Sequence, residues 1–397
     1  MSVYPRRDTQ ARLFSILIGM LAAFLSTIPP ASASPAETVR IGVLAPLSGP
    51  FAAGGSSFLQ AAELAVEQVN SEGGVLGRRV ELAAADTEGR VDVARSEALR
   101  LLSREKVTAL VGAYLSEETV EAMEQAAARR TVLMVPVAAT AEITDRVRRE
   151  YGKYRYVFRV GYSIPQWAEI LASFLKERGA RRYAFVGTGI RWNRELGSAL
   201  EKDAARSGIA QVYAAYYSPG NPAFDPVAVA AAESRPDIVV LGDPGRNSVS
   251  FLVRLREASP GLPVLSVGGA LGDARLAPAL PLSGPLYVQA AAWKGSSPAA
   301  TAYVERFEKR YGTPPVGYSD TLPYDAVILL VAAWRRAGSL SADATIAALE
   351  KGAFPGTAGT YRFDASHQAI WGAGPGTLHG TVIRRERNGG RIAFPGR

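Results

Sequence analysis

Hydrophobic and polar positions follow one another along this chain in blocks that predict strands and helices in turn. Continuous apolar runs predict buried strands at Val39–Ala45, Val80–Ala85, Val107–Gly112 and Thr131–Pro136. Between them, apolar residues recur at helical spacing over Phe58–Asn70, Val93–Lys106 and Glu117–Arg130. Strands that alternate with helices in this way are typical of an α/β fold with a mostly parallel, doubly wound sheet.

A second set of alternating elements follows the basic, tyrosine-rich segment 148–156. Its apolar runs predict strands at Tyr156–Val160, Arg182–Gly187, Gln211–Tyr217, Ile238–Gly242, Val264–Val267 and Leu286–Ala291. Its helical patterns cover Gln166–Arg178, Arg194–Ser207, 225–234 and Asn247–Ala258. The repetition predicts a second α/β lobe.

The last hundred residues begin with helices and end with strands. Helices are predicted at Pro298–Tyr311, Tyr324–Ala337 and Ala342–Lys351, and strands at Gly359–Phe363, Gly380–Arg387 and Arg391–Phe394. The most economical arrangement returns the helices to the first lobe and the tail to the second. We therefore predict an N-terminal lobe of residues 38–157 plus 290–358, and a C-terminal lobe of residues 158–289 plus 359–397. Several crossing strands would form the hinge between them.

The N-terminus has the features of a secretory signal. Arg6, Arg7 and Arg12 form a basic region, and Leu13–Leu25 is an apolar run too short to span a membrane comfortably. Ala31-Ser32-Ala33 fits a cleavage signal, so residues 1–33 are predicted to be a signal peptide cleaved after Ala33. The alternative, an uncleaved anchor, agrees less well with the short apolar run.

Composition narrows the class of protein. The chain has no cysteine, which excludes disulfides, thiolate metal sites, a cysteine nucleophile and the lipidated cysteine of a lipoprotein. Its net charge of +8 falls to about +6 after cleavage, and the basic residues are scattered. We interpret the short clusters Arg146–Arg149 and Arg384–Arg387 as solvated surface, and expect no nucleic-acid partner. A periplasmic protein is the simplest interpretation.

The first predicted strand ends in a loop of small and polar residues that leads directly into a helix. Ser48 and Phe51 lie in this loop, although Phe51 could equally belong to the core. Small-molecule sites in open α/β sheets form at the carboxyl ends of strands, and helix-start amides suit an anionic group. The glycine-rich segment Gly73–Gly77 further along is better explained as a structural turn.

Several motifs resemble the periplasmic binding proteins of the leucine/isoleucine/valine-binding type, over essentially the whole mature chain. They are PLSGP at 46–50, Asn70, Gly73–Arg78, Asp86, Ala94, Tyr324-Asp325-Ala326 and GTAGTYRFD at Gly356–Asp364. The resemblance implies a type I periplasmic-binding-protein clamshell that holds a small-molecule ligand between its lobes. It also implies a partner, the inner-membrane permease of an ABC importer.

The same resemblance implies roles for individual residues. Ser116 matches the family's serine that holds the ligand carboxylate, and Ala139 and Thr140 match an Ala-Thr pair with the same role. Both loops follow predicted strands, and Ser116 precedes a helix whose N-terminal amides attract an anion. Trp192 falls where the family has an aromatic residue that closes over the ligand. A helix cap, a loop hydroxyl and interlobe packing are the alternatives for Ser116, Thr140 and Trp192, respectively.

Three departures from the family pattern bear on the ligand. The family's acid for the ligand ammonium is missing at Gly268-Gly269-Ala270, where Asp243 and Asp273 are the nearest replacements. Gly54 replaces a tyrosine of the first loop, which predicts a larger pocket. Arg191 could pair with a second acidic group of the ligand, although a solvated arginine is the simpler interpretation. A ligand bulkier than valine, or a carboxylate without an amine, is therefore expected.

The function predicted from the sequence is capture of an amino acid or related small carboxylate for an ABC importer. We expect a monomer that is not an enzyme and has no cofactor or metal site. A secreted α/β hydrolase is the rival, but no G-x-S-x-G motif occurs. The two histidines, His367 and His379, lie in the tail, where surface or strand positions explain them better than catalysis. A ligand sensor on the same scaffold is the third alternative.

Overall fold

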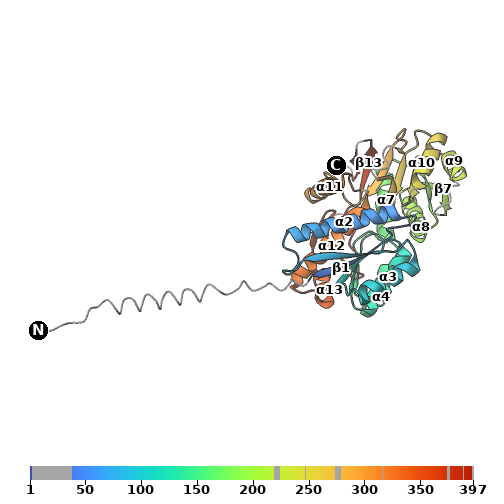
Figure 1. The fold of residues 1–397 in the computed structure, drawn as a ribbon. Helices are drawn as coiled ribbons and strands as arrows, with labels where there is room; N and C mark the ends of the chain where they lie inside the picture. The colour runs from blue at the N-terminus through green and yellow to red at the C-terminus, as the bar shows by residue number, and fades with distance from the viewer. Residues whose placement is uncertain are drawn as a thin grey trace. The chain divides into compact units, whose positions relative to one another are not determined.

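The structure is a computed structural model, and apart from Met1 it describes residues 38–218, 224–245, 247–272, 279–315, 317–372, 376–387 and 389–395. These residues belong to one compact unit that begins at Thr38 (Figure 1). The predicted signal peptide and Asp273 lie outside the described residues. None of the helices in the described part of the chain combines the length and apolar content that a membrane span requires.

The first sheet has five strands, all parallel, in the order β2-β1-β3-β4-β5. They are β1 (Val39–Ala45), β2 (Val80–Asp86), β3 (Ala109–Val111), β4 (Val132–Val135) and β5 (Val157–Arg159). Successive β1 side chains point to opposite faces of the sheet and pack in two separate hydrophobic clusters. Ile41 and Val43 belong to the cluster that includes α2, whereas Leu44 belongs to the cluster that includes α3 and α4. Helices on both faces therefore explain why β1 reads as a continuous apolar run.

Four helices cover this sheet, and they are α2 (Ala52–Ser71), α3 (Val91–Ser103), α4 (Ser116–Ala128) and α12 (Tyr318–Ala337). Helix α12 packs along α2, and α3 packs against α4 (Figure 1). The packing of α12 on α2 brings a late segment of the chain back to the first sheet.

The second sheet has seven strands in the order β14-β13-β10-β9-β8-β6-β7. They are β6 (Arg182–Thr188), β7 (Ala210–Tyr217), β8 (Ile238–Gly242), β9 (Val264–Val267), β10 (Leu286–Ala290), β13 (Thr381–Glu386) and β14 (Gly389–Phe394). The strands from β7 to β10 are parallel, whereas β13 and β14 are antiparallel to their neighbours, so the sheet is mixed. Four helices flank it, α7 (Ile164–Glu177), α8 (Arg191–Arg206), α9 (Asp225–Glu233) and α10 (Asn247–Ala258).

The remaining elements lie between β4 and β5, between β9 and β10, between β10 and α12, or after α12. They are α5 (Glu142–Arg149), α6 (Tyr151–Tyr154), the 3₁₀ turn η1 (Ala270–Gly272), α11 (Pro298–Tyr311), α13 (Ala342–Lys351) and the small hairpin of β11 (Phe354–Gly356) and β12 (Gly359–Tyr361). The Asp325 carboxylate accepts hydrogen bonds from the Thr357 amide at 2.8 Å and the Tyr361 hydroxyl at 2.7 Å. Two of the motifs singled out in the sequence therefore act together, because Asp325 ties α12 to this hairpin.

The glycine-rich turn after α2 is structural, as predicted. The Asn70 side chain accepts from the Val80 amide and donates to its carbonyl, both at 2.8 Å, which closes the turn onto β2. Gly74 has φ +76°, and a Cβ there would lie 2.0 Å from the Arg78 carbonyl oxygen. Only glycine fits that position.

Two predictions about the elements are wrong in part. The strand predicted at Tyr156–Val160 was grouped with the second set, but β5 pairs with β4 in the first sheet. Helix α2 begins at Ala52, six residues before the predicted start, and includes Gly54 and Gly55. Close packing explains these glycines despite their low helix propensity, because a Cβ would lie 2.2 Å from the Tyr114 hydroxyl at Gly54 and 1.9 Å from the Pro46 carbonyl oxygen at Gly55.

Candidate functional site

The two loops expected to hold a carboxylate meet at the carboxyl ends of β3 and β4. Ser116 and Thr140 are both buried, and the Thr140 amide donates to the Ser116 hydroxyl at 3.4 Å. Ala139 is buried beside them, and its carbonyl accepts from the Ile164 amide at 3.0 Å. Ser116 is also the first residue of α4, so its hydroxyl lies at a helix N-terminus. The structure therefore brings these three predicted residues together.

The carboxylate of Glu195, on helix α8 of the second sheet, contacts the Thr140 side of this site. The Thr140 hydroxyl donates to Oε1 of Glu195, on α8, at 3.0 Å. Arg191 Nε donates to the same oxygen at 2.9 Å, whereas Oε2 is buried without a hydrogen-bond partner among the described residues. Sequence reasoning missed Glu195, although its position one helical turn after Trp192 places both side chains on one face of α8.

A fully buried arginine, Arg159, fixes the backbone at Thr140. Arg159 donates to the Thr140 carbonyl at 2.6 Å and to the Thr144 hydroxyl at 2.8 Å, and also to the Gln368 side chain. Burial lowers the pKa of Arg159 to about 9, so the side chain remains a cation at neutral pH. This network fixes the backbone of the loop that carries the Thr140 hydroxyl.

Trp192 is buried next to the glycine pair that lacks the expected acid. Its ring stacks on Trp167 of α7, with centroids 5.2 Å apart and an interplanar angle of 6°. A Cβ at Gly268 would lie 3.3 Å from the Trp192 ring, so the small residue leaves space for the indole. The structure thus places Trp192 in an aromatic stack of the second lobe.

Asp243 is buried at the end of β8, and its oxygens are engaged within its own lobe. One oxygen accepts from the Tyr217 hydroxyl at 2.6 Å and the other from the Gly245 amide at 2.6 Å. Burial raises the pKa of Asp243 to about 6. The structure shows no contact of Asp243 with Ser116 or Thr140 among its described hydrogen bonds, so these residues are not joined directly.

The first loop contributes less than expected. Ser48 is exposed, and its amide donates to Oδ1 of Asp86 at 3.2 Å. Phe51 is buried in the core, which agrees with the alternative considered for it. The prediction that Gly54 enlarges the pocket is wrong, because a Cβ there would lie 2.2 Å from the Tyr114 hydroxyl. The Tyr114 ring fills the space beside Gly54.

Arg191 is not simply solvated, contrary to the simpler interpretation. It forms an ion pair with Glu195 at 2.9 Å and another with Glu142 of α5 at 2.6 Å. Since α5 follows β4 and α8 follows β6, the second pair joins helices of the two sheets. Arg191 therefore orients the Glu195 carboxylate, with its own side chain 38% exposed.

The histidines give no support to a hydrolase. His367 is buried rather than on the surface, with Nε2 3.1 Å from the Glu350 carboxylate and its ring stacked on Phe158. His379 Nδ1 lies 3.1 Å from the Gly372 carbonyl oxygen. Within the described ranges, no three His, Asp or Glu side chains form a group that could hold a metal ion.

Comparison with known proteins agrees with this architecture. The family described as periplasmic binding protein matches residues 38–373. Leu/Ile/Val-binding protein homolog 3 from Brucella melitensis is 27% identical to this chain over 248 residues. The aligned region covers 62% of this chain and 65% of that relative, which is less than two thirds of the relative's length.

Solved structures show the same fold. A leucine-binding protein from Thermotoga maritima superposes with a TM-score of 0.76 at 22% identity, over 89% of this chain and 97% of that one. A solute-binding protein from R. palustris in complex with benzoate gives a TM-score of 0.77 at 20% identity, over 90% and 95%. With a family match across most of its length and two α/β lobes of the type I arrangement, the chain belongs to the periplasmic binding proteins.

Proposed function

We propose that this protein is the periplasmic solute-binding component of an ABC importer and captures an apolar amino acid by closure of two lobes. The lobes would be residues 38–157 plus 290–358 and residues 158–289 plus 359–397, after export and cleavage behind Ala33. Its partners would be the small-molecule ligand and the inner-membrane permease, with the protein itself monomeric. Ser116, Ala139 and Thr140 would bind the ligand carboxylate, with Trp192 beside the ligand's apolar side chain.

The observation that carries this proposal is the hydrogen bond between Thr140 and Glu195. A hydroxyl donor of the first lobe and a carboxylate of the second face each other directly, at 3.0 Å. An α-amino acid carries both complementary groups, a carboxylate for the donor and an ammonium for the acceptor. Inserted between them, it would satisfy both, and the buried Oε2 of Glu195 would gain a partner.

Glu195 therefore takes the role for which Asp243 and Asp273 were the candidates. A buried ammonium needs an anionic partner. Asp243 already accepts two hydrogen bonds within its own lobe, whereas Glu195 contacts the place of the expected ligand carboxylate. Relatives named for leucine, isoleucine and valine support an amino acid, and the benzoate complex of a structural neighbour makes an amine-free acid the alternative.

The first test compares ligands and removes the hydroxyls. Thermal-shift measurements with leucine, isoleucine, valine, benzoate and 4-hydroxybenzoate should give stabilisation by at least one of them, because a ligand that binds only the folded state raises its stability. In calorimetry, Ser116→Ala combined with Thr140→Val should weaken binding of that ligand about tenfold or more, since each change removes a hydrogen bond to a charged group. Ser96→Ala with Thr360→Val, at exposed positions, is the matched control. Equal affinity in both double variants would contradict the site.

The second test distinguishes an amino-acid ligand from an amine-free acid by whether Glu195→Gln weakens or strengthens binding. For an amino acid, Glu195→Gln should weaken binding about tenfold or more, because the ammonium loses its charged partner. For an amine-free acid, the same variant should bind more tightly, because the ligand carboxylate no longer competes with that of Glu195. Calorimetry with leucine and benzoate on the same preparations gives both answers, and tighter benzoate binding would replace our choice of ligand class.

A further inference from the structure

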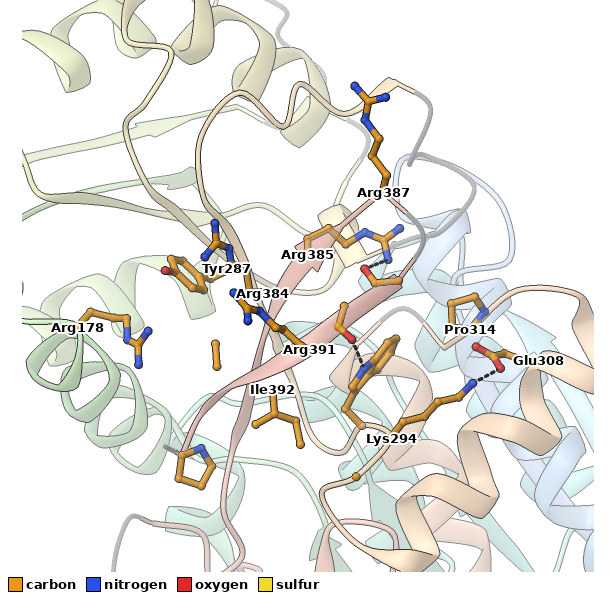
Figure 2. A pocket seen from close by; sticks show the side chains of 16 residues that line it. Arg178, Tyr287, Lys294, Glu308, Pro314, Arg384, Arg385, Arg387, Arg391 and Ile392 are labelled. Carbon is orange, nitrogen blue, oxygen red and sulfur yellow. Dashed lines mark hydrogen bonds and ion pairs between the residues drawn. The ribbon is translucent and has the colours of Figure 1, made fainter. Parts of the chain in front are cut away.

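Away from the Ser116–Thr140 site, a large cavity with strongly basic walls lies against the edge of the second sheet. Its volume is about 860 Å³, and it lies between the β13–β14 hairpin, the C-terminal end of α7 and the connection from β10 to α11 (Figure 2). The Arg384–Arg387 cluster belongs to it, so the interpretation of that cluster as solvated surface is wrong in part. Arg385 is buried, and Arg384 is half-buried.

The charges around this cavity are unbalanced. Its lining contains six basic side chains and one carboxylate, and the basic ones are Arg178, Lys294, Arg384, Arg385, Arg387 and Arg391. The carboxylate, Glu308, forms an ion pair with Lys294. Arg391 also contacts Glu386 at 3.3 Å, in a pair exposed on both sides and therefore weak. Arg178 pairs with Glu177 at 3.1 Å, so the excess of basic over acidic groups is greatest around Arg384 and Arg391 on the β13–β14 hairpin.

Two of these arginines stand directly opposite each other. In the antiparallel pairing of β13 with β14, Arg384 faces Arg391, and Tyr287 of β10 faces Arg384 from the other side. Like charges at directly opposed positions of a sheet are destabilising. Arg384 has no ion pair with any residue in the described part of the chain. An anion between the two guanidinium groups would turn this repulsion into attraction.

The cavity also offers an apolar wall beside the arginines. Tyr287 and Trp293 are largely buried and line it together with Ile392. The Trp293 indole is fixed, because its Nε1 donates to the Gly390 carbonyl at 3.1 Å. A bare inorganic ion would use only the charged part of such a cavity, whereas an organic anion would use both parts.

We propose that this cavity binds an organic phosphate, with the phosphoryl group between Arg384 and Arg391 and the organic part against Tyr287, Trp293 and Ile392. Guanidinium forks match the several oxygens and the double charge of a phosphoryl group. The site is separate from the amino-acid site and does not depend on the function proposed for it. A soluble phosphate ester and a phospholipid headgroup share this chemistry.

The test uses the full exported protein at about 0.15 M salt, which screens nonspecific attraction. Glycerol 3-phosphate in calorimetry represents a soluble ester. Co-sedimentation with phosphatidylglycerol vesicles, against phosphatidylcholine vesicles, represents a headgroup. Arg384→Gln with Arg391→Gln should weaken binding of the positive probe at least tenfold. Arg79→Gln with Arg206→Gln removes the same charge at exposed positions and should change it less than twofold.

Stability measurements keep this test independent of folding defects. Without anion, the Arg384→Gln and Arg391→Gln double variant should unfold at the same temperature as the wild type or higher, because it lacks the repulsion. The positive probe should raise the unfolding temperature of the wild type but not of the variant. Binding to neither probe, or equal losses in the variant and its control, would overturn the proposal. Unchanged binding of the amino-acid ligand by the variant is expected, and its loss would show that the change reaches the interlobe site and would also overturn the proposal.

Discussion

Replacing Arg159 with methionine is expected to lower the free energy of unfolding by about 3 kcal/mol or more, because buried acceptors that lose charged donors retain their desolvation cost. Three acceptors are affected, the Thr140 carbonyl, the Thr144 hydroxyl and the Gln368 side chain. Methionine fills much of the same volume but donates no hydrogen bond. Urea unfolding at pH 7 measures the change.

A matched control separates this effect from the loss of any arginine. Arg206 is exposed at the end of α8 and, within the described ranges, its one ion pair is with Asp203 at 2.6 Å. Arg206→Met should change the free energy of unfolding by less than about 0.5 kcal/mol, as is usual for surface positions. A similarly small change for Arg159→Met would mean that water reaches the three acceptors in its place.

The Arg159 variant also tests how the carboxylate site is held. Arg159 contacts Thr140 only through its backbone carbonyl, so it positions the loop and does not touch the expected ligand. The variant that remains folded should therefore bind the ligand more weakly than wild type, with Arg206→Met unchanged. Preserved affinity would show that β4 and α5 fix the loop without Arg159.

Local patterns in the sequence predicted most of the fold. Apolar runs of β1 and β8 are unambiguous because both faces of each strand are covered by helices. The partner of β5 was not predictable, because a three-residue strand carries no periodicity that assigns it to one sheet. The start of helix α2 was also not predictable, because tertiary packing and not the helix propensity of Gly54 decides where the helix begins.

The candidate site was predictable only where a residue follows a strand. Ser116 and Thr140 come at strand ends, and parallel strands bring such ends together. Glu195 lies inside a helix, where its contact with Thr140 depends on how the two lobes meet. Tyr114 beside Gly54 is a compensation of the same kind, since two residues distant in sequence share one space. Such contacts leave no local signal in a single sequence.

Glu118 provides the last prediction, a stability that falls as pH rises. This buried residue of α4 accepts from the Leu115 amide at 3.1 Å, but burial dominates and raises its pKa from 4.5 to about 7. The folded state therefore binds this proton more tightly than the unfolded state does. Its stabilising effect is complete below pH 4.5 and is lost between pH 4.5 and 7, where the carboxyl must ionise against burial.

Glu118→Gln should remove that dependence, because the amide cannot ionise. Relative to wild type, the variant should gain about 3 kcal/mol of unfolding free energy between pH 4.5 and pH 8, because folding raises the pKa of the Glu118 carboxyl from 4.5 to about 7. Urea unfolding of both proteins at the two pH values gives this difference of differences, in which the titration of all other groups cancels. Glu233→Gln removes the same charge at an exposed position of α9, far along the chain from Glu118, and is the control. A gain no larger than that of the control would mean that the bond from Leu115 and the α4 N-terminus stabilise the Glu118 charge enough to offset its burial.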